Sequence, residues 1–113
     1  MRTIVAGSRS IIDPAVVAAA MDACGWLPAV IISGAARGVD RLGECWAEEQ
    51  GIPVERYPAD WKRHGRSAGM IRNRQMAQVA DALIAIWDGH SRGTAGMVEI
   101  MQKAGKRVHM HRV

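Results

Sequence analysis

The chain has 113 residues, which is enough for one domain with a single modest hydrophobic core. Hydrophobic residues make up 49% of it, but no apolar run approaches the roughly 18 residues of a membrane span, so we expect no membrane partner. The formal charge of +4 suits an anionic partner such as a nucleotide, a phosphate or a nucleic acid.

Apolar segments alternate with helical patterns along the chain. Short apolar runs predict strands over residues 3–6, 28–32, 54–57, 81–87 and 106–110. The third of these is the least apolar and is expected near a sheet edge. Helical spacing predicts helices from Pro14 to near Gly25, from Val39 to Gln50, from Ser67 to Val79, and after Thr94 as far as Gly105. The basic stretch 58–66 is irregular, and so long a loop is usually functional or mobile.

Strict alternation of strands and helices predicts the α/β class. We expect a Rossmann-like three-layer sandwich with a five-stranded parallel sheet in the order 3-2-1-4-5, formed by residues 1–113 as one domain. In this order the chain reverses direction between strands 1 and 4. A crevice therefore opens there, at the carboxyl edge of the sheet.

Three glycine-containing turns would meet at this crevice, at residues 7–9, 33–38 and 88–94. Any one of them could simply satisfy backbone geometry. Together they favour an anion, because free N–H groups at a helix start bind phosphate and guanidinium groups add bidentate contacts. The arginines in these turns are Arg9, Arg37 and Arg92. A branched side chain at Gly34 or Gly93 is expected to fill the space that the phosphate needs.

Two candidate contacts lie at helix starts. Asp40 could complement the helix dipole, which is the default for an acid in the first turn, or contact a ribose. The pair Arg72-Asn73 could be an exposed turn of its helix or a phosphate or ribose contact. The sequence leaves both questions open.

The basic stretch 58–66 carries one aromatic residue, Trp61, which could stack on a base as part of a lid or pack permanently onto the core. Asp60 and Asp88, at the ends of separate strands, are the carboxylates we would test as a general acid or base. A solvated turn is the default for both.

Other residues bear on location and cofactors. Met1 leads directly into a strand pattern, so we expect no signal peptide and a cytoplasmic protein. Cys24 and Cys45 lack CxxC spacing and are expected to be small buried hydrophobes. His109 and His111 have no acidic or cysteine partner at metal-ligand spacing, so we expect neither a metal nor another cofactor.

Five motifs in chain order resemble the SLOG superfamily, and within it the small YspA/YpsA-related branch. They are Gly7-Ser8-Arg9, the run from Ser33 to Asp40, Pro58-Ala59-Asp60-Trp61, the run from Ala68 to Asn73, and Trp87-Asp88-Gly89 with Ser91-Arg92-Gly93-Thr94. This superfamily has a Rossmann-like fold and includes DprA and the LONELY GUY phosphoribohydrolases. The resemblance implies binding of a nucleotide or a nucleotide derivative, often in phage or bacterial conflict.

The resemblance places ligand contacts at Gly7, Ser8, Arg9, Ser33, Gly34, Gly38, Asp40, Arg72, Asn73, Gly93 and Thr94. From the turns and the basic stretch we add Arg37, Trp61, Asp88 and Ser91. The phosphoribohydrolases carry a catalytic Glu three residues after their turn Thr, and this chain has Met97 there. Glu99 should not replace it, because two residues turn a helix by about 200°.

Three function classes follow. The first is a nucleotide-derivative binding module that acts as a sensor or sequesters its ligand. The second is a hydrolase of a nucleotide N-glycosidic or phosphate bond, and the third is a DprA-like binder of single-stranded DNA. The sequence leaves open whether the chain is an enzyme and whether it forms a homo-oligomer.

Overall fold

Five strands form one parallel sheet, as predicted. They are β1 (Arg2–Gly7), β2 (Val30–Ser33), β3 (Val54–Arg56), β4 (Ala82–Trp87) and β5 (Arg107–Arg112). The computed structural model describes residues 1–113. The order across the sheet is β3-β2-β1-β4-β5 and every neighbouring pair is parallel, so the predicted topology is confirmed. The least apolar strand, β3, lies at an edge as expected.

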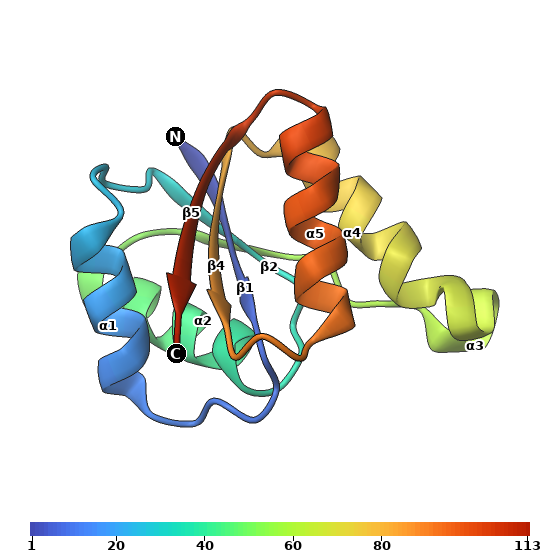
Figure 1. The fold of residues 1–113 in the computed structure, drawn as a ribbon, viewed down its shortest axis with the longest axis horizontal. Coiled ribbons are helices and arrows are strands. Elements are labelled where there is room, and N and C mark those ends of the chain that lie inside the picture. The colour runs from blue at the N-terminus through green and yellow to red at the C-terminus, as the bar shows by residue number, and fades with distance from the viewer.

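Four helices cover the sheet and make it the middle of three layers (Figure 1). On one face lie α1 (Pro14–Ala23) and α2 (Val39–Gln50), and on the other lie α4 (Ala68–Val79) and α5 (Arg92–Lys103). The cap of α1 forms as expected: the Asp13 carboxylate accepts a hydrogen bond from the Ala15 N–H. Gly51 ends α2 in the left-handed conformation, which glycine adopts without a steric penalty.

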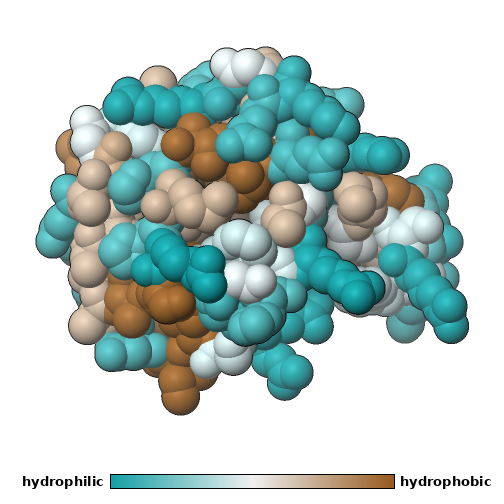
Figure 2. Space-filling view, in the orientation of Figure 1, coloured by the Kyte–Doolittle hydropathy of each residue, from teal (hydrophilic) through white to brown (hydrophobic).

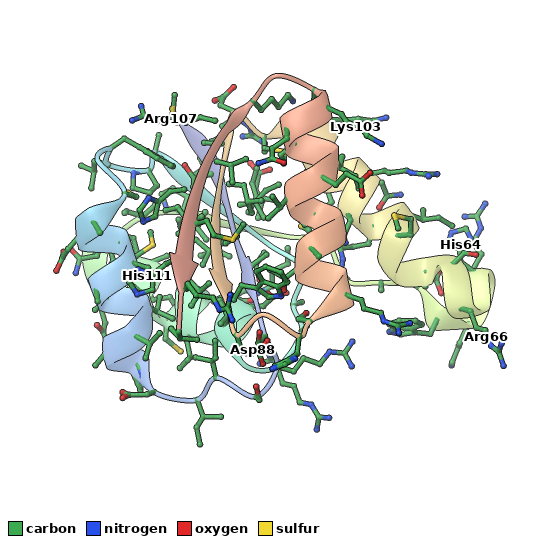
Figure 3. The ribbon with its side chains drawn as sticks, viewed as in Figure 1. His64, Arg66, Asp88, Lys103, Arg107 and His111 are labelled. Carbon is green, nitrogen blue, oxygen red and sulfur yellow. The ribbon has the colours of Figure 1, made fainter.

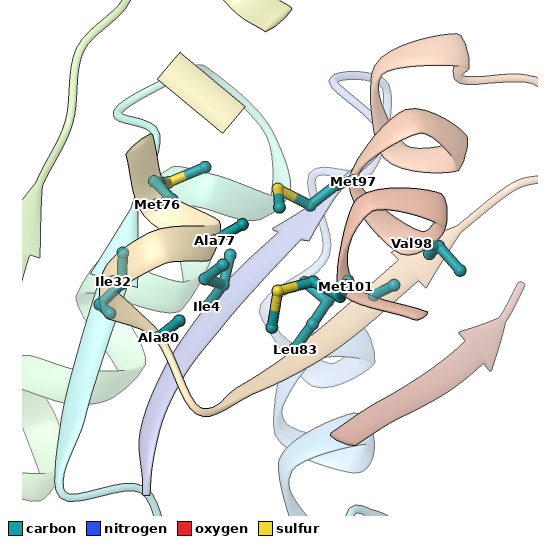
Figure 4. Close-up of a cluster of buried hydrophobic side chains, with 10 residues drawn as sticks. Ile4, Ile32, Met76, Ala77, Ala80, Leu83, Met97, Val98 and Met101 are labelled. Carbon is teal, nitrogen blue, oxygen red and sulfur yellow. The ribbon is translucent and has the colours of Figure 1, made fainter. Parts of the chain in front are cut away.

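The core consists of two clusters, one on each face of the sheet. Ile4 and Leu83 point toward α4 and α5, where they meet Met76, Met97 and Met101 (Figure 4). Their strand neighbours point to the opposite face, toward α1 and α2, because side chains alternate along a strand. Both faces of β1 and β4 are therefore buried, which explains why these strands are continuous apolar runs.

The stretch 58–66 is not irregular throughout, which corrects the prediction. It contains a short helix, α3 (Trp61–His64), followed by a 3₁₀ turn, η1 (Gly65–Ser67). Asp60 initiates α3, since its carboxylate accepts from the Arg63 N–H at 3.1 Å. Asp60 is thus a helix cap and lines neither cavity described below.

Residues 58–67, which we call the arm, project from the side of the molecule beyond α4 (Figure 1). No residue of α3 or η1 is buried. Figure 2 shows several hydrophilic side chains on this part of the surface, and His64 and Arg66 point away from the sheet (Figure 3).

Two further findings concern burial and length. Cys24 is buried as expected, but Cys45 is exposed on α2, because it lies on the side of that helix that faces away from the sheet. No helix in the structure has the length and the apolar composition needed to cross a bilayer.

Candidate functional site

A cavity of about 470 Å³ opens at the carboxyl ends of β1 and β4. We call it the main cavity. Its walls are the turn after β1, the turn after β4, the start of α2 and one face of α4. The helices that follow β1 and β4 lie on opposite faces of the sheet, so the two turns diverge and leave this space between them.

The structure distributes the fifteen predicted contacts over three locations. Ten line the main cavity: Gly7, Ser8, Arg9, Asp40, Arg72, Asn73, Asp88, Ser91, Gly93 and Thr94. A second cavity of about 320 Å³ is lined by Gly34, Arg37 and Trp61, and Arg9 and Arg72 also border it. Ser33 and Gly38 line neither cavity.

The turn after β1 is fixed by its backbone. The Ser8 carbonyl oxygen accepts from the N–H groups of Ile11 and Val39, and the Ser8 hydroxyl oxygen accepts from the Asp88 N–H at 3.2 Å. A Cβ on Gly7 would overlap the Ile86 carbonyl oxygen and lie 2.7 Å from Val39 Cγ2. Gly7 and Ser8 therefore hold three turns together at the cavity rim.

Gly38 also lets two turns approach each other, here from the α2 side of the contact with the β1 turn. Its φ is +79°, and a Cβ there would lie 2.6 Å from the Arg9 Cα. Only glycine lets the start of α2 approach the β1 turn so closely. Gly38 lines neither cavity and shapes the turn, while its predicted contact with a ligand stays a prediction.

Asp88 organises the turn after β4 and lies where that strand ends (Figure 3). Its carboxylate accepts from the His90 N–H at 2.8 Å, the Ser91 N–H at 3.3 Å and the Ser10 hydroxyl at 3.3 Å. These bonds, that of the His90 N–H foremost, hold the pKa of Asp88 below its ordinary value. An ionised carboxylate used in this way is poorly suited to donate a proton.

The N-terminus of α5 also borders the main cavity. Ser91 caps it: its hydroxyl oxygen accepts from the Thr94 N–H at 3.3 Å and from the Thr94 hydroxyl at 2.9 Å. The N–H groups of Arg92 and Gly93 have no protein acceptor. Gly93 lies within the helix, with open space where a Cβ would be, so its lack of a side chain is not needed for packing.

Arg92 does not line either cavity, contrary to our expectation. It is exposed, because the first turn of α5 directs its side chain outward. The position of the hydrolases' catalytic Glu and the nearest acid of the helix also separate: Met97 is buried and lines the main cavity, while Glu99 is exposed and pairs with Lys103 at 2.8 Å. No acid of α5 faces the cavity.

Arg72 and Asp40 face each other across Gly34. A Cβ on Gly34 would lie 2.6 Å from Arg72 Nη1 and 2.8 Å from Asp40 Oδ2. Arg72 Nη1 donates to the Gly34 carbonyl oxygen at 2.6 Å, and Arg72 Nε donates to Asn73 Oδ1 at 2.9 Å. Gly34 thus makes room for two protein side chains and also lines the second cavity, while its predicted contact with a phosphate stays a prediction.

Burial shifts the pKa values of both Asp40 and Arg72. Burial raises the pKa of the Asp40 carboxyl to about 6, although the Ala36 N–H and the Arg72 guanidinium favour its charged form. Burial also lowers the pKa of Arg72, and the charge of Arg9 acts in the same direction. Asp40 therefore does more than complement the helix dipole, and Arg72 is not on an exposed turn.

The Ser33 hydroxyl points away from both cavities because it hydrogen-bonds with Glu44, a residue that the sequence did not single out. Its hydroxyl donates to Glu44 Oε2 at 2.7 Å and accepts from the Ala35 N–H at 3.1 Å. Glu44 is buried and accepts from Arg56 Nε at 2.8 Å, which links the ends of β2 and β3. The signal was present, since Glu44 lies one turn after Asp40 on the apolar side of α2, where a charge needs partners.

The sequence did not predict some further residues of the main cavity, because only the direction of their side chains in the folded chain brings them there. Ser10 and His90 lie within the two rim turns, and Met76 and Met97 lie one helical turn after Asn73 and Thr94. The two methionines line the main cavity. They also belong to the core cluster on that face of the sheet (Figure 4). No three His, Cys, Asp or Glu side chains lie close enough together to hold a metal ion.

Comparison with known proteins places this chain. The gene 61 protein of Mycobacterium phage D29 is 39% identical over 82 residues, which are 67% of this chain and 66% of the phage protein. The structure of DNA processing protein A (DprA) from Streptococcus pneumoniae is similar in fold, with a TM-score of 0.74 and 20% identity. That similarity covers 96% of this chain and 49% of the DprA chain, so this chain spans about half of DprA. The model of the family described as "YspA, cpYpsA-related SLOG family" matches residues 1–64, and the chain belongs to that family.

Proposed function

We propose that residues 1–113 act as a single cytoplasmic domain that binds a phosphorylated nucleotide or nucleotide derivative in the main cavity. The observation that carries this proposal is the N-terminus of α5. Two N–H groups without protein acceptors, those of Arg92 and Gly93, lie there beside a cavity that Arg9 and Arg72 also line. Helix N-termini bind phosphate because their free N–H groups and the helix dipole both favour negative charge.

The rest of the main cavity suits a nucleoside. Asn73 is buried at its wall, with its amide already oriented by Arg72 Nε and the Gly93 carbonyl oxygen. Asp40 offers a carboxylate oxygen to a ribose hydroxyl, and the four apolar residues of the lining suit the uncharged part of a nucleoside: Ala6, Ala36, Met76 and Met97. A volume of about 470 Å³ lies within the range of small-molecule sites, which is roughly 300–1,000 Å³.

The geometry favours binding over hydrolysis. The Asp88 carboxylate accepts hydrogen bonds within its own turn, and Glu99 pairs with Lys103 outside the cavity. Met97 lies at the position where the related hydrolases have an acid. Asp40 is then the one remaining carboxylate in the cavity. We therefore expect slow or no release of base or phosphate from nucleotides, measured by chromatography after long incubation.

Isothermal titration with AMP and ADP tests the proposal. We expect micromolar to submillimolar binding, and Arg9→Gln should weaken it about tenfold, the loss expected for one charge-assisted contact. Arg41→Gln is the matched control, because Arg41 is an exposed arginine that lines neither cavity. Absence of binding at millimolar nucleotide, or equal effects of the two substitutions, would overturn the proposal.

A second candidate function is binding of single-stranded DNA. The observation that favours it is Trp61, which is 53% exposed and is followed in the arm by Lys62, Arg63, His64 and Arg66. Exposed aromatic and basic side chains together bind single strands. Fluorescence anisotropy with a labelled oligothymidine tests it: binding should weaken steeply with salt and should require Trp61.

A further inference from the structure

The second cavity adjoins the main cavity without being part of it. The loop after β2 forms one side, Pro58, Ala59 and Trp61 of the arm form the other, and three residues belong to both cavities: Arg9, Ala36 and Arg72. A ligand that fills the main cavity therefore has a direct route into the second one. Two of the three residues shared by the cavities are arginines.

The charges of the two cavities differ. Asp40 and Asp88 line the main cavity, but no carboxylate lines the second, where all three charged residues are arginines: Arg9, Arg37 and Arg72. None of these three forms an ion pair, and the hydrogen bonds of Arg72 go to neutral oxygens. Asp40 is the nearest carboxylate to Arg72, but it lies on the main-cavity side and forms no ion pair with it. Three unpaired cations along the border of the second cavity favour an anion between them.

Trp61 gives the second cavity an aromatic wall. Its side chain is 53% exposed, and its indole N–H has no protein acceptor. The ring edge leans on the start of α4: a Cβ on Gly69 would lie 3.7 Å from Trp61 Cη2. A large aromatic side chain left this exposed contributes little to the core, but it offers a face on which a planar ring can stack.

We propose that the second cavity is a subsite for a second nucleoside, so that the ligand is a dinucleotide whose phosphate bridge lies between Arg9 and Arg72. This inference rests on the proposed function, because the first nucleoside occupies the main cavity. The base of the second nucleoside stacks on Trp61. Arg37 lies beside the same subsite and contacts the second half of the ligand alone.

The test compares ADP with diadenosine diphosphate, which has the same two phosphates and one more nucleoside. In isothermal titration the wild-type chain should bind diadenosine diphosphate at least tenfold more tightly than ADP, the gain expected from one stacked base. Trp61→Ala should remove this gain and leave the affinity for ADP within twofold of wild type. Trp61→Phe should retain most of the gain, since it keeps an aromatic face.

Two arginine substitutions distinguish a contact within the second subsite from a general loss of positive charge. Arg37→Gln should weaken diadenosine diphosphate binding several-fold without changing ADP binding, whereas Arg41→Gln should change neither. Circular dichroism melting of each variant establishes that it is folded, which we expect because none of these side chains is buried.

Each contrary outcome has its own meaning. Equal wild-type affinities for ADP and diadenosine diphosphate, or equal losses for both in Trp61→Ala, would overturn the second subsite and leave the proposed function standing. Failure of the wild-type chain to bind ADP would overturn the proposed function itself. Trp61-dependent binding of oligothymidine without binding of diadenosine diphosphate would overturn the dinucleotide in favour of a nucleic-acid strand.

Discussion

The two sides of the paired cavities are held in place by different interactions. The inner side, formed by the turns after β1, β2 and β4, is tied to the sheet and the helices by buried polar contacts such as those of Ser8 and Glu44. The outer side is the arm, residues 58–67, whose hydrogen bonds in α3 run within the arm itself. The Gly65 carbonyl oxygen accepts from the Ala68 N–H and so joins η1 to α4. The ring of Trp61 leans on the start of the neighbouring helix α4.

The site thus combines a part held in fixed positions with a part that can adjust. The inner side presents its N–H groups and guanidinium groups in set positions, which lowers the ordering cost of binding an anion. The arm buries no residue, and regions with few buried contacts open locally at low free-energy cost. Under the proposed function, the inner side would hold the phosphate and the arm would close over the rest of the ligand.

The largest expected effect comes from adding one methyl group to the inner side. Gly7→Ala should destabilise the protein by several kcal/mol or prevent folding, since its Cβ overlaps backbone and overpacking alone costs about 1–3 kcal/mol. Gly69→Ala, where the arm touches α4, should be neutral or stabilising by up to about 1 kcal/mol, because its Cβ has ordinary contacts and alanine favours the helix. Urea unfolding measures both. Equal costs at the two positions would contradict the comparison.

The next effect is a pH dependence on the inner side. The pKa of Asp40 rises from 3.8 to about 6 on folding, so the folded state retains a proton that the unfolded chain has lost. This contribution, about 3 kcal/mol at 1.36 kcal/mol per pKa unit, is fully present below pH 3.8 and is lost as the pH rises through 6. The free energy of unfolding of wild type minus that of Asp40→Asn should therefore fall between pH 4 and 7. If this difference in unfolding free energy did not change with pH, the pKa of Asp40 would not be raised in the folded protein.

A smaller effect tests the link between β2 and β3. Glu44→Gln removes the charge that Arg56 and the Ser33 hydroxyl bind, which should cost about 1.5–3 kcal/mol, the range for hydrogen bonds to charged groups. Glu48→Gln is the matched control: its carboxylate is 68% exposed and 3.7 Å from Arg56, so it should cost less than about 0.5 kcal/mol. Thermal melting distinguishes the two, and similar losses would mean that Glu44 is not a structural tie.

The smallest effect on stability belongs to the arm. Trp61→Ala should lower the free energy of unfolding by less than about 1 kcal/mol, whereas Met101→Ala in the core should cost about 2–5 kcal/mol. Hydrogen exchange followed by NMR should show amides of residues 62–67 exchanging far faster than those of β4. Equal protection in the two regions would show that the arm is a fixed part of the fold.

The sequence by itself determined the five strands, the four long helices and their order, but not the short helix α3 or the turn η1. Strands buried on both faces must be apolar throughout, and helices must repeat their apolar residues every three to four positions, so each element carries its own signature. The glycine turns could also be placed at one edge, because parallel strands end there together. Ten of the predicted contacts therefore line one cavity, while their binding of a ligand remains a prediction.

The tertiary structure decided which way the turn residues face. Ser33 and Gly34 are adjacent in a predicted phosphate turn, yet Ser33 faces Glu44 on α2, and Gly34 makes room for Arg72, which lies 38 residues further along the chain. Periodicity describes contacts within an element, but these contacts arise between elements that meet only after folding. The same reason explains the second cavity: it exists because the arm and the loop after β2 come to lie side by side, and no local pattern records that meeting.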